Sequence, residues 1–295
     1  MSFLGFGNYN KPGKGIVKEE LQKRRGLIFF EVVFRKFWKM LQLSLLYTFC
    51  SIPALIIYLF VAMSAVSNLI INNSSQETFA TMAEPSFMLS ILVALGILLF
   101  IGSGPVSCGF VYVLRNFSRE EHAWIYSDFF EHFKKNFKQG MAMFLIDIVV
   151  IFLMSVNALF YMSKLGAEMP PLFRTIIITL LTMASIVYVM MHFYIYPMMV
   201  TFDLKFKQIL KNSLLLTFYK LPQNVGMLIL TVAIFGGVVY FSITRVFLFV
   251  LIPLLVYSFS TLMQLFYCYS VIEKVMIGEK EENEEDIERT FKDSL

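Results

Sequence analysis

Six long runs of apolar residues, separated by short polar segments, account for most of the chain. They cover residues 41–71, 87–114, 141–162, 175–200, 225–241 and 246–272. A helix needs about 20 mainly apolar residues to cross the hydrocarbon core of a bilayer. The runs are continuously apolar and do not alternate with a period of two, which favours helices over the strands of a barrel. The pattern therefore predicts an all-α fold, a polytopic membrane helical bundle of about six transmembrane helices.

Three shorter segments, each just before an odd-numbered run, combine aromatic and basic residues; they are 29–39, 129–138 and 204–220. In the second segment, phenylalanines fall on one helical face and lysines on the other. This pattern is typical of amphipathic helices in the cytoplasmic interface, with lysines at anionic headgroups. The second and third segments also align at one constant offset. That alignment indicates either an internal duplication or the usual enrichment of such residues in cytoplasmic loops.

The basic residues are distributed unevenly between alternate polar segments. Of the 25 Lys and Arg residues, 22 lie before the first run, between the second and third, between the fourth and fifth, or after the sixth. Under the positive-inside rule, this places both termini in the cytoplasm. We therefore divide the chain into a basic N-terminal segment with an interfacial helix (1–40), a six-span transmembrane domain (41–272) and an acidic cytoplasmic tail (273–295).

The composition agrees with a membrane protein, and the absence of common catalytic and metal-binding motifs from the sequence reduces the number of possible functions. The chain is 58% hydrophobic and 16% charged, whereas soluble domains are about 45–50% apolar and about 25% charged. The three cysteines lie in apolar segments without close spacing, which predicts packing roles and no metal site. There is no HExxH motif, GxSxG elbow or complete P-loop. We therefore expect a non-enzymatic protein without catalytic residues or a cofactor, whose partners are anionic lipid headgroups and not nucleic acid.

Two features inside the runs carry candidate chemistry. Gly104, Pro105 and Gly109 interrupt the second run, which indicates either a kinked packing contact or a broken helix that lines a site. Asp147 is the one acidic residue well inside a run, and ionisable groups at that depth face the bundle interior. It either pairs with a nearby lysine or handles a ligand, proton or ion. These four residues form a candidate ligand or ion pathway, whereas we expect His192 to be a hydrogen-bonded packing residue.

The most polar cytoplasmic loop lies between the second and third runs. Its candidate docking residues for a partner protein are Arg115, Asn116, Arg119, Asp128 and Asn136. The alternative is a solvated loop whose arginines contact lipid phosphates.

Several short segments within residues 1–140 carry a family resemblance. They are 8–15 (NYNKPGKG), 34–39 (FRKFWK), 104–109 (GPVSCG), 115–116 (RN), 127–130 (SDFF) and 133–139 (FKKNFKQ). Together they resemble the YesL-like family of bacterial integral membrane proteins, which has no established biochemical function. Members are often encoded beside sugar-uptake ABC transporters and glycan-degradation enzymes. The resemblance implies a protein of the bacterial cytoplasmic membrane in a carbohydrate-uptake context, and it brings no catalytic residues.

Two hypotheses follow for the function. The first is an accessory or regulatory membrane protein that binds ABC-transporter subunits. The second is a secondary transporter or permease for a small solute, which the broken second run and Asp147 favour.

The topology can be tested with single cysteines at Ser74 and Ser294. Because Ser74 lies in the loop after the first run and Ser294 in the tail, a membrane-impermeant thiol reagent should label them from opposite sides. Labelling of both from the same side would contradict the six-span topology.

Overall fold

The computed structural model describes residues 25–73, 90–162, 166, 168–245, 251–272 and 275. Within these ranges the chain is helical and contains no strand, so the expected all-α fold is confirmed. The motif at 8–15, the acidic tail apart from Val275, and both labelling positions, Ser74 and Ser294, lie outside the described residues.

Within the described ranges, four apolar helices are long enough to cross a membrane. They are α6 (Phe137–Met162), α8 (Pro171–Thr201), α10 (Leu221–Thr244), and η2 (Ile252–Val256) continued by α11 (Tyr257–Ile272). Two further pairs pass the same test jointly but are bent. The helix Gly26–Cys50 meets Ile52–Ser64 at 64°, and Ser90–Phe100 meets Pro105–Ser118 at 59°. Counting each bent pair as one span gives six, as the hydropathy pattern predicts, and the fold is that of a polytopic helical bundle.

The breaks in these helices occur where the sequence disfavours a regular helix. The bend between α1 (Arg25–Cys50) and α2 (Ile52–Asn73) lies at Ser51, two residues before Pro53. Pro253 lies in the π-helical turn η2, because proline cannot donate the backbone hydrogen bond that an α-helix needs. The segment 29–39 is the first half of α1 and not a separate interfacial helix, since no breaker separates it from residue 41. The boundary expected at residue 40 therefore falls inside a helix.

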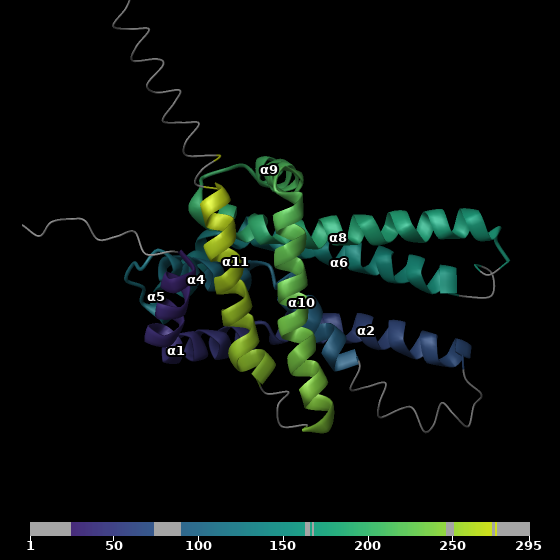
Figure 1. Cartoon of the computed structure of the whole chain (residues 1–295), viewed down its shortest axis with the longest axis horizontal. Helices are drawn as coiled ribbons and strands as arrows, with labels where there is room; N and C mark the ends of the chain where they lie inside the picture. Colours follow the sequence, from purple (N-terminus) through teal and green to yellow (C-terminus); the bar gives the residue numbers. More distant parts are fainter. Residues whose placement is uncertain are drawn as a thin grey trace, which may run out of the picture.

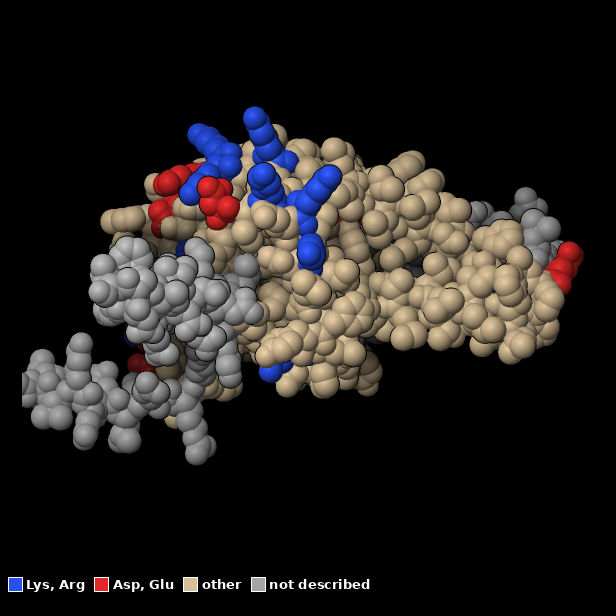
Figure 2. All heavy atoms as spheres, turned by 90° about the horizontal axis from the view of Figure 1, so that it is seen from above, with Lys and Arg blue, Asp and Glu red and all other residues tan. Residues whose placement is uncertain are grey.

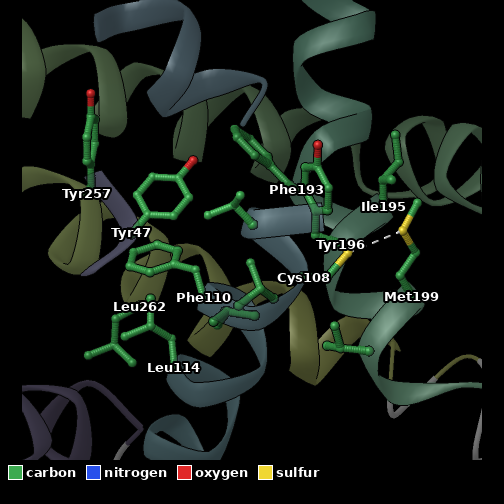
Figure 3. Packing of buried hydrophobic residues seen from close by; sticks show 14 of the residues in the cluster. Tyr47, Cys108, Phe110, Leu114, Phe193, Ile195, Tyr196, Met199, Tyr257 and Leu262 are labelled. Carbon is green, nitrogen blue, oxygen red and sulfur yellow. Dashed lines mark hydrogen bonds between the residues drawn. The ribbon is translucent and has the colours of Figure 1, made fainter. Parts of the chain in front are cut away.

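The helix α4 (Pro105–Ser118) occupies the centre of the packing. It contacts α1, α6, α8 and α11, and also the short helix α5 (Ile125–Lys135). Eleven of its residues are buried. Figure 3 shows Phe110 beside Tyr47, with ring centroids 4.2 Å apart, and Cys108 pointing toward Met199 of α8. Of the three cysteines, all free, Cys108 and Cys268 are buried, as packing residues should be.

The long helices form two groups that run in different directions. In Figure 1, α6 and α8 lie side by side along the long axis with α2 nearby, while α10 and α11 cross this direction steeply. The outer parts of α6 and α8 expose large apolar side chains, such as Phe152, Leu172 and Leu180. Figure 2 shows this half as almost free of charge, whereas lysines, arginines and acidic residues gather over the other half. Exposed apolar helices of this kind face lipid in a membrane protein.

The proposed repeat has a counterpart in the helix order. The short helix α5 packs mainly on α4 and is followed directly by α6. In the same way, α9 (Phe206–Tyr219) packs mainly on α8 and is followed directly by α10. Of the aromatic residues in this pattern, Phe129 of α5 is fully buried, whereas Phe130 and Phe137, the first residue of α6, are each 41% exposed. Phe129, Phe133 and Phe137 line an apolar groove of about 340 Å³ together with residues of α2, α4 and α6. Packing against protein thus accounts for part of the aromatic pattern, and the exposed rings fit the interfacial position that the sequence predicts.

The closeness of α4 and α5 can be tested at Gly109. A Cβ atom there would lie 2.4 Å from the Phe129 carbonyl oxygen, whereas a Cβ at Gly226 of α10 would meet nothing within 4 Å. We expect Gly109→Ala to destabilise the protein by about 1–3 kcal/mol, because backbone must shift. The control Gly226→Ala should leave stability unchanged or raise it by up to about 1 kcal/mol. Thermal unfolding in detergent, followed by circular dichroism, measures both; equal stabilities would contradict this packing.

Candidate functional site

The candidate site begins at the break between helix Ser90–Phe100 and α4. Gly102 and Gly104 have φ angles of +95° and +66°, which favour glycine. A Cβ atom at Gly104 would lie 2.7 Å from the Phe144 Cβ and 2.8 Å from the Gly140 carbonyl oxygen of α6. The glycines therefore serve both the turn of the backbone and the close approach of α6.

Side-chain hydroxyl groups satisfy the backbone polar groups that the break exposes. Tyr58 of α2 donates to the Gly102 carbonyl oxygen at 2.8 Å, and the Gly104 N–H donates to the Tyr196 hydroxyl of α8 at 3.3 Å. The Ser103 N–H donates to the Ser107 hydroxyl at 2.8 Å. Ser103 also bonds Ser51, at the bend between α1 and α2, at 2.8 Å. Because lipid offers no replacement for these bonds, the break depends on the helices around it.

Asp147 lies one turn beyond Phe144 on α6 and is fully buried. The Tyr188 hydroxyl donates to its Oδ1 atom at 2.5 Å, and Nε2 of His192 lies 3.0 Å from the same oxygen. Among the described residues, no hydrogen-bond partner is found for the Oδ2 atom. Of the two roles expected for Asp147, pairing with a lysine is not what the structure shows, since its partners are a histidine and a tyrosine.

The tyrosines around Asp147 connect it with the break. Tyr188, His192 and Tyr196 are spaced four residues apart on α8, so they share one helical face. The first two contact Asp147 and the third holds the Gly104 N–H. Tyr58 of α2 and Tyr196 both bond the backbone of the break.

A small polar cavity adjoins this cluster. It has a volume of about 40 Å³, and its polar lining residues are Tyr47, Ser107, His192, Tyr196, Tyr257, Thr261 and Gln264. Tyr47, Tyr196 and Tyr257 are seen around the buried part of α4 in Figure 3. The cavity is therefore lined by both His192 and Ser107 of the break.

The four residues of the candidate pathway thus have different roles. Gly104 and Pro105 form the break, and Asp147 lies beside it through Phe144 and Tyr196. Gly109 packs against the backbone of α5 and supports the close approach of two helices. His192 is hydrogen-bonded, as expected, but its partner is Asp147.

The sequence pattern did not indicate the hydroxyl groups around the break. Tyr58, Tyr188 and the serines lie in apolar runs, where such residues are common and individually carry no signal. The spacing of Tyr188, His192 and Tyr196 by four residues was the one pattern that could have indicated a polar face inside the bundle. In the part of the chain that the structure describes, no group of three or more His, Cys, Asp or Glu side chains could hold a metal ion.

A second candidate surface is the charged end of the molecule. Arg35 of α1 donates to Glu120, just after α4, at 2.5 Å, and Lys36 donates to the Glu121 carbonyl oxygen at 3.2 Å. Arg119 pairs with Glu121 at 3.1 Å. Two surface hollows lie here, one of about 390 Å³ beside Arg35 and Glu120 and one of about 280 Å³ beside Arg119. Basic segments separated by some 85 residues in the sequence therefore share one end of the protein.

The five docking candidates differ in exposure. Arg119 is exposed and lies over the ring of Tyr269, and half-buried Arg115 lies over the rings of Tyr112 and Tyr269. Asp128 accepts a hydrogen bond from the Trp124 N–H at 2.9 Å.

The two asparagines are turned away from the surface. Asn116 is 4% exposed, and Asn136 donates to the His132 carbonyl oxygen at 3.1 Å and thereby caps the end of α5. Arg119 is thus the most available of the five for a partner, and the asparagines support the loop.

Comparison with protein families gives one match. The family described as "Protein of unknown function, DUF624" matches residues 37–158. The matched range contains the break and Asp147 but ends before Tyr188 and His192, so it covers one half of the cluster. Comparison with curated proteins and with solved structures gives no match.

The charged end should show a pH dependence through His132. Burial lowers the pKa of this histidine, which stacks on Tyr112. Because the folded pKa lies below the unfolded value of about 6.5, the unfolded chain binds the proton first, and stability falls as the pH drops below about 6.5. We expect His132→Gln to flatten this fall, whereas exposed His122→Gln should preserve it. Unfolding in detergent across this pH range measures the effect; identical curves for wild type and His132→Gln would contradict it.

Proposed function

We propose that this membrane-embedded helical chain is a non-enzymatic accessory or regulatory protein of the bacterial cytoplasmic membrane. Its charged end would bind a partner protein, and the resemblance to the YesL-like family suggests subunits of a carbohydrate ABC transporter. The uneven distribution of lysine and arginine supports a cytoplasmic position for this end and for both termini.

The observation that carries this proposal is the contrast between the interior and the charged end. Pockets for small molecules usually have volumes of about 300–1,000 Å³. The polar cavity beside the break has only about 40 Å³, and the larger groove of about 340 Å³ beside Pro105 is lined almost wholly by apolar residues. The hydroxyl groups around the break are engaged with its backbone and are not left for a solute. Since the described residues form no large polar cavity around the break that could bind a sugar, this contrast favours a protein that acts on a partner over one that passes a sugar.

The chemistry of the charged end supports partner binding. Arg35, Arg119, Glu120 and Glu121 present both signs of charge beside hollows of about 390 and 280 Å³. Exposed ion pairs contribute little to stability, so they can exchange partners at small cost. Charged patches of this kind set the orientation of protein complexes and speed their formation.

A secondary transporter or permease is the second candidate. The broken helix and the buried Asp147 favour it, because transporters place discontinuous helices and ionisable residues at their sites. In this alternative the small cavity is the closed state of a larger site.

Co-purification and flux assays separate the two candidates. The full chain is co-expressed with the sugar ABC transporters of its own bacterium and purified by a tag on the chain. We expect a stable complex with transporter subunits and no sugar flux through vesicles that contain the chain alone. Arg119→Glu should weaken the complex by about tenfold or more, since like charges across an interface cost several kcal/mol. Arg174→Glu, at the far end of α8, is the matched control and should bind as the wild type does.

Two results would contradict the proposed binding of a partner at the charged end. Sugar flux by the purified chain alone would establish the permease, and a complex that both charge reversals weaken equally would place the interface elsewhere.

A further inference from the structure

We infer that Asp147 and His192 together bind one exchangeable proton inside the bundle. The inference rests on the donors and acceptors of this pair, on its burial and on the cavity beside it. It goes beyond the proposed partner binding, and neither depends on the other.

Counting hydrogens fixes the number of protons that the pair holds. Nδ1 of His192 lies 2.9 Å from the Tyr188 carbonyl oxygen, which can only accept, so Nδ1 carries a hydrogen. Nε2 lies 3.0 Å from Oδ1 of Asp147. If the ring is neutral, Nε2 accepts and Asp147 must be protonated; if the ring is an imidazolium, Nε2 donates to a carboxylate. Both forms contain one proton more than a carboxylate beside a neutral histidine.

Because both side chains are buried, this proton decides whether the pair carries a net charge inside the bundle. Asp147 is 0% exposed and His192 is 5% exposed. With the proton the pair is neutral overall, whereas without it a net negative charge remains in the bundle. An uncompensated charge in a medium of low dielectric constant is costly, and Oδ2 has no hydrogen-bond partner to reduce that cost. The packing around the pair therefore favours the form that holds the proton.

The other groups near Asp147 are uncharged phenols. α8 contributes Tyr188 and Tyr196, and α2 contributes Tyr58. The titratable side chains of α4 make other contacts. Cys108 donates to Met199, Tyr112 stacks on His132, and Arg115 lies over the rings of Tyr112 and Tyr269.

The charged residues of α5 and α6 add no compensation at Asp147. Those of α5 are Asp128, Glu131, Lys134 and Lys135, and Lys138 lies nine residues before Asp147 on α6. Among the described residues, the ion pair of Asp147 is with His192 and no lysine or arginine is bonded to it. His192 is therefore the group on which the charge of Asp147 depends.

The cavity offers space for water beside the pair. His192 lines it together with Ser107, Tyr196 and Gln264. A water molecule needs about 10–15 Å³ and two to four polar partners, and the cavity of about 40 Å³ supplies both. A proton that leaves the pair passes to water as hydronium, and its return reverses the same step, so that only N–H and O–H bonds form and break. No redox partner is required.

The proton-binding pair also lies close to the broken helix. Tyr196 lies one helical turn from His192 and holds the Gly104 N–H at 3.3 Å. The same face of α8 therefore carries both the histidine of the proton-binding pair and the hydroxyl that holds the break.

Infrared difference spectroscopy on the purified full chain tests the inference. The protein, in vesicles of phosphatidylcholine and phosphatidylglycerol, carries isotope labels on aspartate and histidine and is titrated through and beyond the range of about pH 5–8 in which histidines usually change charge. We expect one aspartate and one histidine signal to change with the same midpoint. Asp147→Asn should remove both changes, and His192→Gln should remove the shared midpoint. Asp128→Asn, an aspartate outside the bundle interior, should leave both intact.

A second variant removes only one hydroxyl group, so that the inference can still be tested if Asp147→Asn does not fold. Tyr188→Phe removes the hydrogen bond to Oδ1 of Asp147, so the infrared bands of the aspartate and the histidine should both change in frequency. Tyr240→Phe, on the exposed face of α10, is the matched control and should leave both bands unchanged. Separate midpoints for the two groups, unchanged signals in Asp147→Asn, or equal band frequencies in wild type and Tyr188→Phe would each overturn the inference.

Discussion

The need to satisfy every backbone polar group inside an apolar bundle governs this structure. Between helix Ser90–Phe100 and α4 the regular hydrogen bonds stop, and lipid cannot replace them. Tyr58, Tyr196 and Ser107 supply the missing bonds from α2, α8 and α4. Because these side chains come from distant parts of the sequence, the break is stable only when the whole bundle has assembled.

The same constraint explains the surroundings of Asp147. A buried carboxyl group needs a donor or a positive partner. Tyr188 and His192 meet this need from a neighbouring helix, on the face that also reaches the break through Tyr196. The polar interior is thus one connected arrangement in which backbone and charge are satisfied by the same stretch of α8. The charged end, in contrast, consists of exposed ion pairs whose value lies in binding and not in stability.

Much of the fold follows from local pattern. The apolar runs at 141–162 and 175–200 correspond to α6 and α8, and the proline and glycine positions mark the bends. The first run did not reveal that α1 begins at Arg25, because an amphipathic segment and an apolar one can continue as a single helix. The aromatic face around α5 suggested the membrane interface, and the structure divides it between the buried Phe129 and the exposed Phe130 and Phe137. Periodicity identifies a face but does not say what covers it.

The sequence by itself determined that the chain is a helical membrane protein and that Asp147 and the Gly104–Pro105 break are unusual. These conclusions depend on the hydropathy and conformational preference of single residues, which are local properties. Only the tertiary structure decided that Asp147 pairs with His192, that tyrosines complete the break, and that Asn116 and Asn136 are buried. Contacts between α6 and α8 depend on how helices cross in space, and no local pattern specifies that crossing.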